Sequence, residues 1–218
     1  MSSIESRYDM PDYMLGNLQQ TQQSAGLSQQ NTQSLLRSEG DASSFSNYAQ
    51  RLSEIDQELQ QTDNASAREG FRNMVQSFAE NPGQAELDSF VQASSDMEQQ
   101  EREEFASTAQ NVQEQGGSEL MREWSNQASR IYNQDSQAGS QFVQASSHVL
   151  ELSQNEQNEA EVAQENLSSF LEISSRAEQS RDNQSSLQQF LDEVQSSADS
   201  EELQGVYNNY YQNLTDAV

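Results

Sequence analysis

Several residue types are missing or rare in this chain, and each absence excludes a class of function. There is no cysteine, so disulfide bonds and thiolate metal sites are excluded. The single histidine, His148, cannot make a zinc site or a catalytic pair alone, because both need further ligands or a partner base. Phosphate-binding loops, nucleophile elbows and dinucleotide fingerprints are also lacking. We therefore expect no enzyme activity, no metal and no cofactor.

Lysine is absent too, and all ten basic residues are arginine. With 36 acidic residues, the formal net charge is -26. In molar salt the Debye length falls to ~3 Å, so repulsion between carboxylates is screened and an acidic surface stays hydrated. The composition resembles that of haloarchaeal proteins in general, and it predicts a halophile or a virus of one as the source.

The arginines are dispersed among carboxylates and form no basic stripe, so we expect no direct binding to DNA or RNA. They are Arg7, Arg37, Arg51, Arg68, Arg72, Arg102, Arg122, Arg130, Arg176 and Arg181. The chain contains no run of ~18 apolar residues, so no membrane span is expected. Its N-terminus lacks a signal-peptide pattern, which predicts cytoplasmic synthesis, with incorporation into a virus particle as a later step.

Only 32% of the residues are hydrophobic, which is too few for a thick globular core. Helices can still fold around a narrow apolar stripe, because two apolar positions in seven are enough for a coiled-coil seam. We divide the chain into four parts by its pattern: a polar arm at 1–44, helical segments at 45–117 with a break at 81–83, a heptad-patterned region at 118–204, and a Tyr-rich helical tail at 205–218.

The region 118–204 carries the longest pattern. Steps of three and four from Met121 meet apolar or small residues as far as Ala198, over about eleven heptads. Polar interruptions near 135–139, 155–159 and 181–186 are candidate turns, so either one long helix or folded hairpins is possible. The seam is rich in Ala and Ser and buries little area, so we expect partner helices. The predicted fold is all-α, an elongated helical bundle or antiparallel coiled-coil hairpins that form a homo-oligomer.

We find no internal repeat at a fixed period of 30 to 50 residues, which argues against a solenoid. The stretch Val-Gln-Ala-Ser-Ser occurs at 91–95 and again at 143–147. Because the chain is so rich in Ser and Gln, we interpret this recurrence as chance similarity.

Aromatic and apolar clusters are the candidate contacts with a partner protein, since such residues anchor interfaces. The densest cluster follows the break near Asp63, and core packing is the favoured alternative for the single tryptophan. The acidic run at 98–104 is interpreted as a solvated helix face rather than a cation site. The candidate interface residues are Phe71, Met74, Val75, Phe78, Trp124, Tyr207, Tyr210 and Tyr211.

These observations favour a non-enzymatic helical structural or assembly protein, such as a scaffold, internal or tail-associated virion component of a halophilic archaeal virus. Its partners would be copies of itself or other helical virion proteins. The helices at about 120–200 resemble in composition the cytoplasmic hairpins of methyl-accepting chemoreceptors, which implies a coiled-coil adaptor or signalling protein as the alternative. A gas-vesicle-type surface protein of a haloarchaeon is a third hypothesis, and the missing repeat argues against it.

Overall fold

The computed structural model describes residues 42–80, 84–154, 159–180 and 183–216. All regular secondary structure in these residues is α-helical, which confirms the predicted all-α class. Most of the predicted polar arm and the break at 81–83 lie outside the described residues. The eight described helices are α3 (Ala42–Gln60), α4 (Ala65–Glu80), α5 (Gln84–Asp96), α6 (Gln99–Gln134), α7 (Ser136–Ser153), α8 (Glu159–Gln179), α9 (Asn183–Ser196) and α10 (Ser200–Asp216).

Side-chain caps start several of the helices. Asn64, Asp135 and Asp199 each accept a hydrogen bond, at 2.9 to 3.1 Å, from a main-chain N–H two or three residues later. Such caps satisfy N–H groups that have no partner inside a helix. Gly117 divides α6 into two halves, because its φ of 82° is left-handed and favours glycine. The predicted division between residues 117 and 118 therefore coincides with a kink.

The region 118–204 is a series of helices and not one long helix. The polar interruption at 135–139 begins directly after the end of α6 at Gln134 and contains the start of α7 at Ser136. The interruption at 155–159 lies between α7 and α8, and the interruption at 181–186 lies between α8 and α9 and includes the start of α9. Residues 155–158 and 181–182 are outside the described part. The predicted start of a separate tail at residue 205 falls inside α10.

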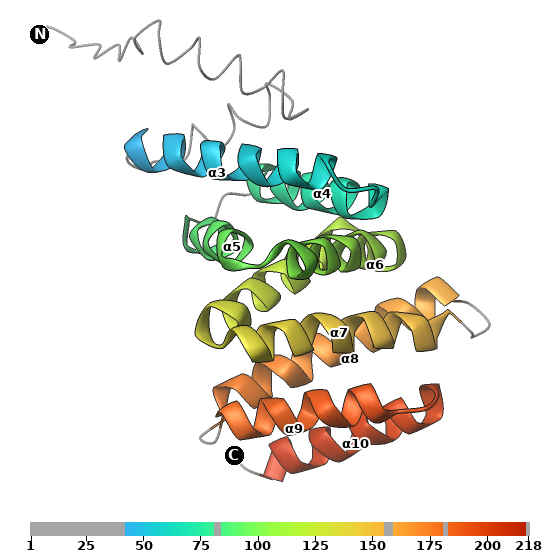
Figure 1. Ribbon diagram of the computed structural model, residues 1–218. Helices are drawn as coiled ribbons and strands as arrows, with labels where there is room; N and C mark the ends of the chain where they lie inside the picture. The colour runs from blue at the N-terminus through green and yellow to red at the C-terminus, as the bar shows by residue number, and fades with distance from the viewer. Residues whose placement is uncertain (1–41, 81–83, 155–158, 181–182, 217–218) are drawn as a thin grey trace, which may run out of the picture.

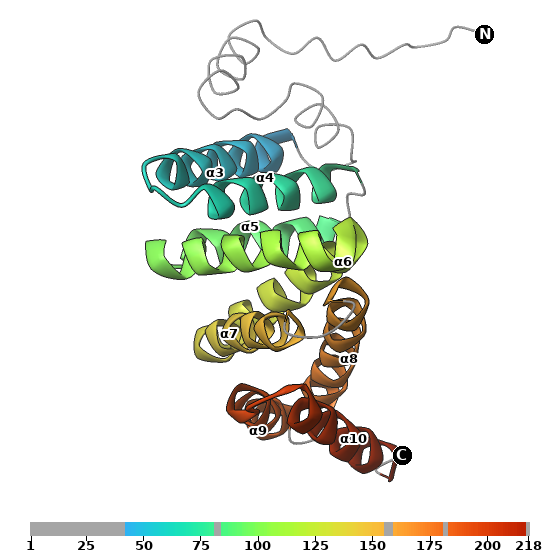
Figure 2. The same ribbon diagram turned by 90° about the vertical axis from the view of Figure 1, so that its right-hand side faces the viewer.

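The helices are stacked one after another from α3 to α10 (Figure 1). Contacts join helices one or two places apart in the chain, apart from a small contact between α7 and α10. Interhelical hydrogen bonds and helix contacts sort the helices into two rows. Row 1 contains α3, α5, the second half of α6, α8 and α10; row 2 contains α4, the first half of α6, α7 and α9. Figure 2 shows the same stack from the side.

A continuous line of aromatic side chains runs through the middle of the stack. Neighbouring rings have centroids 5.0 to 6.4 Å apart, at angles between 28° and 40°. Each ring is at most 1% exposed. Aromatic contacts of this kind stabilise a core beyond the burial of their area. We call this line the aromatic spine, and its members are Phe71, Phe90, Phe105, Trp124, Phe142, Phe170, Phe190 and Tyr207.

The aromatic spine gives a structural reason for the recurring Val-Gln-Ala-Ser-Ser stretch, which we interpret from the sequence as chance similarity. Including the preceding Phe, the stretch Phe-Val-Gln-Ala-Ser-Ser is repeated at 90–95 in α5 and at 142–147 in α7. Both copies have the same order of buried and exposed positions, and so does Phe-Leu-Glu-Ile-Ser-Ser at 170–175 in α8. The similarity therefore follows from equivalent places in the stack. No fixed period reveals it, because turns and helices differ in length. Stacking of neighbouring units is also the principle of solenoid proteins, so the missing fixed period does not argue against a solenoid-like stack.

The positions of the heptad frame lie in the core, but the core is wider than a coiled-coil seam. Met121, Ala128 and Val149 from the frame are at most 1% exposed. Leu167 and Leu171, outside the frame, are buried equally well. The reason is that the helices between α3 and α10 pack against neighbours on two sides. Helices α4 and α6 also approach each other closely at Gly70. A Cβ atom at this position of α4 would lie 1.9 Å from the carbonyl oxygen of Ala106 in α6.

Candidate functional site

A groove of about 860 Å³ crosses three successive helices of row 1, namely α5, the second half of α6, and α8. We call it the row-1 groove. Most of its lining residues are polar or charged, with charges of both signs, although apolar atoms make up the larger part of the exposed lining. The lining residues are Ala85, Glu86, Ser89, Glu123, Asn126, Gln127, Arg130, Ser168, Leu171, Glu172, Ser175 and Arg176.

Two arginines from neighbouring helices face this groove, each held by a carboxylate. Arg130 of α6 donates from Nε and Nη2 to Glu178 of α8, at 2.9 and 2.6 Å. Arg176 of α8 donates from Nη2 to Glu172 at 2.5 Å. The side chains of Arg130 and Arg176 remain 49% and 48% exposed. Both guanidinium groups therefore keep N–H donors toward the groove after their ion pairs have formed.

Two amides of the groove have unused hydrogen-bonding groups. Gln127 is only 5% exposed, and its Nε2 has no hydrogen-bond partner among the described residues. The Oδ1 atom of the adjacent Asn126 is likewise buried without a partner in the described part of the chain. A buried polar group without a partner costs about 1–3 kcal/mol. Both atoms have almost no accessible surface, so they lie beneath the surface of the groove and are not open to it.

The eight predicted interface residues do not gather at one surface. Six of them are buried in the chain's own core: Phe71, Met74, Val75, Phe78, Trp124 and Tyr207 are each at most 2% exposed. We therefore assign these six residues to packing, the alternative that the sequence favours for Trp124. The indole N–H of Trp124 donates to Ser146 Oγ at 2.8 Å. Sequence patterns marked these residues because core and interface anchors are chemically alike.

Tyr210 and Tyr211 are the two predicted interface residues that stay partly exposed. The Tyr210 ring meets Phe190 edge-on, and burial, followed by the charge of Glu193, raises the pKa of Tyr210 to about 12. The Tyr211 hydroxyl donates to Glu172 at 2.9 Å, and its ring lies 5.9 Å from the Arg176 guanidinium carbon. Tyr211 therefore contacts two residues that line the row-1 groove.

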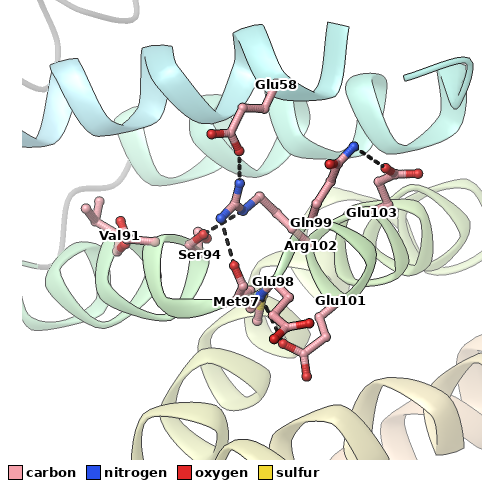
Figure 3. A network of polar contacts seen from close by, with 10 residues as sticks. Glu58, Val91, Ser94, Met97, Glu98, Gln99, Glu101, Arg102 and Glu103 are labelled. Carbon is pink, nitrogen blue, oxygen red and sulfur yellow. Dashed lines mark hydrogen bonds and ion pairs between the residues drawn. The ribbon is translucent and has the colours of Figure 1, made fainter. Parts of the chain in front are cut away.

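A second polar cluster lies at the joint of α5 and α6 and has a structural role (Figure 3). Arg102 is buried and donates to the carbonyl oxygens of Ser94 and Met97, at 2.8 and 2.7 Å. It also forms an ion pair with Glu58 of α3. One side chain thus ties α3 to the turn between α5 and α6.

The acidic run beside this joint is only partly the solvated face that we expected. The carboxylate of Glu101 accepts hydrogen bonds from Tyr132 Oη at 2.9 Å, from Ser140 Oγ at 2.8 Å and from the main-chain N–H of Glu98 at 3.1 Å. Burial alone would raise the pKa of Glu101, but these hydrogen bonds lower it overall. Burial, followed by the charge of Glu101, raises the pKa of Glu104.

The single histidine, His148, makes a contact between two helices. His148 Nε2 lies 2.8 Å from the carbonyl oxygen of Ser197, a contact that joins α7 to the end of α9. The described residues contain no group of three or more His, Cys, Asp or Glu side chains suited to a metal ion. None of the helices described here is both long enough and apolar enough to cross a membrane.

Sequence reasoning missed the row-1 groove. Its residues are spread over about ninety positions of the chain and are ordinary Ser, Glu, Gln, Asn and Arg. Comparisons with protein-family models, with curated proteins and with solved structures find no match to this chain. A function must therefore be inferred from the stack and its groove.

Proposed function

We propose that this protein is a non-enzymatic helical scaffold that binds a partner protein along row 1. One observation carries the proposal: the row-1 groove spans three successive helices, and the half-exposed Arg130 and Arg176 keep N–H donors that their ion pairs do not use. A stack of helices presents such a surface because successive members of one row lie side by side. The favoured class is therefore an interaction or assembly protein, which includes the adaptor alternative.

The predicted homo-oligomer is retained as a second form of the same proposal. The exposed positions of α10, the last described helix, are polar apart from Gly205, which argues against indefinite end-to-end stacking. A polar outer face ends a stack of repeats and keeps it in solution. These positions include Glu201, Glu202, Gln204, Asn208 and Asn209. A contact through row 1 between two copies remains compatible with this arrangement.

The assignment to a virus particle stays a prediction that rests on composition alone. The adaptor alternative is not tied to a particle and needs only a partner protein.

The scaffold proposal is tested with the full chain in molar KCl. We would cross-link the tagged chain in its source cells or particles, identify proteins enriched over an acidic helical control of similar charge, and purify each candidate. We expect one candidate to form a complex of fixed stoichiometry with the purified chain in size-exclusion chromatography with light scattering. If every candidate elutes separately, and the chain itself stays monomeric at high concentration, the scaffold proposal is wrong.

A further inference from the structure

We infer that two copies of this chain form a closed dimer through α10, in which each copy places its α10 beside the α10 of the other. The inference uses a surface outside the row-1 groove. It rests on the homo-oligomer that the scaffold proposal retains as its second form, and it specifies the contact. It is carried by the position of α10 in the stack and by an uncharged stripe of side chains along one side of this helix.

Helix α10 lies at the end of the described stack, opposite to α3 (Figures 1 and 2). Each earlier helix of row 1 is followed in the chain by a helix of row 2 that packs against it, as α8 is followed by α9. No described helix takes the corresponding place after α10. The side of α10 next to α9 therefore borders a place where the architecture of the stack accommodates one more helix.

Four side chains form a stripe along this side of α10. The ring of Tyr210 meets Phe190 of α9 edge-on, which puts Tyr210 on the side of row 2. Residues three and four apart share a helix face, so Val206 and Asn213 lie on the same side as Tyr210. Asn209, three residues after Val206 and four before Asn213, completes the α10 stripe. The valine and the tyrosine are partly buried against the core, and the two asparagines are exposed.

The α10 stripe is uncharged, although the chain has a net charge of -26. Residues 203–215 contain no acidic or basic residue. The centres of protein interfaces are depleted in charged residues and enriched in tyrosine. Two copies with the same large negative charge repel each other least where no carboxylates are brought together. Carboxylates at the edge of the contact, such as Asp192 and Glu202, are screened beyond ~3 Å in molar salt.

A second uncharged run, at 136–150 in α7, is less suited to this role. Helix α7 contacts α6 on one side and α8 and α9 on the other. Phe142, Val143 and Val149 of this run are buried in the chain's own core. The exposed and half-exposed positions of the run hold only Ser, Gln and His, so it offers no aromatic or apolar anchor to a partner.

The chemistry of the α10 stripe fits a second copy of itself. A twofold contact brings the same surface of both copies together, so that surface has to be self-complementary. Asparagine amides donate and accept hydrogen bonds, so Asn209 and Asn213 can pair with the same residues of the other copy. A partner of opposite charge would find no carboxylate in the stripe to bind. Such a pair is closed, which agrees with the argument against indefinite stacking.

The contact is small, so we expect a weak dimer. Helix α10 has 17 residues and is about 26 Å long at a rise of about 1.5 Å per residue. One pair of helices of this length buries less than the roughly 1,600 Å² of a standard interface. We therefore expect a dissociation constant in the micromolar range.

The test measures the mass of the purified full chain by light scattering in molar KCl, from micromolar to millimolar concentrations. We expect the mass of two chains at high concentration. The double variant Asn209→Asp/Asn213→Asp adds two carboxylates to the α10 stripe of each copy. It should raise the dissociation constant of the dimer roughly tenfold or more, because like charges then face each other.

The matched control is Asn208→Asp/Gln212→Glu, which adds the same charge to the same half of α10 on another side. Asn208 follows four residues after Gln204, whose amide donates to α8, and Gln212 follows after four more. This control should leave the dissociation constant nearly unchanged. All four positions are exposed, and equal melting temperatures will show that both double variants fold. Gln144→Glu, in the uncharged run of α7, should also dimerise as the unmodified chain does.

The lack of cysteine allows the arrangement of the two copies to be measured with spin labels. One label is attached through Asn208→Cys on α10, and the other, in a separate sample, through Asn47→Cys on α3; both positions are exposed. In the inferred dimer the two labels at 208 are close together, and the two labels at 47 are separated by the length of both stacks. A shorter distance between the labels at 47 than between those at 208 would overturn the inference.

The outcomes separate this inference from the scaffold proposal. If the chain has the mass of one copy at every concentration while a partner protein binds along row 1, the scaffold proposal stands and the α10 dimer is refuted. If the control double variant or Gln144→Glu weakens the dimer as much as the stripe variant does, the α10 stripe is not the contact. If a single copy binds a different protein through the stripe, that protein is the occupant and the second copy is refuted.

Discussion

The joint around Arg102 allows a prediction whose size follows from the contacts. Arg102→Ala removes the donor from two carbonyl oxygens, those of Ser94 and Met97, and removes a buried side-chain stem. Each buried acceptor left without a partner costs about 1–3 kcal/mol. With the lost packing of the stem, we expect the free energy of unfolding to fall by about 3–5 kcal/mol.

The ion pair with Glu58 contributes little to this figure. The Glu58 side chain is 54% exposed, and an exposed pair is worth about 0–1 kcal/mol before screening by salt. Glu58→Gln is therefore the matched control, which should lower the free energy of unfolding by less than about 1 kcal/mol. It keeps the shape of the side chain and leaves both carbonyl oxygens bound.

The assay is urea unfolding of both variants at constant molar KCl, followed by far-ultraviolet circular dichroism and by the emission of Trp124. Circular dichroism reports the helices as a whole, whereas Trp124 reports the second half of α6. Coincident curves are required before a single free energy is derived. If Arg102→Ala and Glu58→Gln destabilise the chain equally, the ion pair and not the carbonyl contacts holds the joint, and our reasoning is refuted.

Three further predictions follow from the core. Gly70→Ala should lower the free energy of unfolding by about 3 kcal/mol, because its Cβ would meet the main chain of α6. Gly205→Ala should raise the free energy of unfolding by about 0.5–1 kcal/mol, because its Cβ would meet only open space among the described residues. Equal urea midpoints for the two variants would contradict this. Phe142→Ala should cost about 3–5 kcal/mol by opening a gap in the aromatic spine, and a loss below about 1 kcal/mol would show that the spine relaxes. Burial, followed by the hydrogen bond to Glu101, raises the pKa of Tyr132 to about 12, so its contribution to stability is present below pH 10 and is lost as the pH rises toward 12. The stability of Tyr132→Phe should therefore fall less steeply above pH 10 in alkaline titrations, and parallel curves would refute the assignment.

The sequence predicted the helices and many core positions because both depend on local patterns. The heptad steps led to Met121 and Val149, and the polar interruptions led to the ends of α6, α7 and α8. The heptad pattern underestimates the width of the core, because a coiled-coil seam has only one facing helix. Residues such as Leu171 are buried by a second neighbour, and a seam drawn for a coiled coil omits them.

The repeat and the groove could not be predicted in the same way. The repeated unit is one helix with a buried aromatic residue, and unequal turns hide its period: Phe142 and Phe170 are farther apart in the chain than Phe90 and Phe105. The groove depends on which helices become neighbours, a property of the stack. Arg130 and Arg176 are unremarkable in the sequence and become a pair only when α6 and α8 lie side by side.

The kink at Gly117 has a consequence for how the chain comes apart. Because α6 continues from row 2 into row 1, a single covalent helix belongs to both rows in the middle of the stack. The chain therefore lacks a linker at its centre where two halves could separate as domains. Fraying should begin at α3 and α10, which have neighbours on one side only among the described helices, and amide protons of α6 should exchange with solvent last. A partner bound across α5, α6 and α8 would hold that central, slowest-opening part of the molecule.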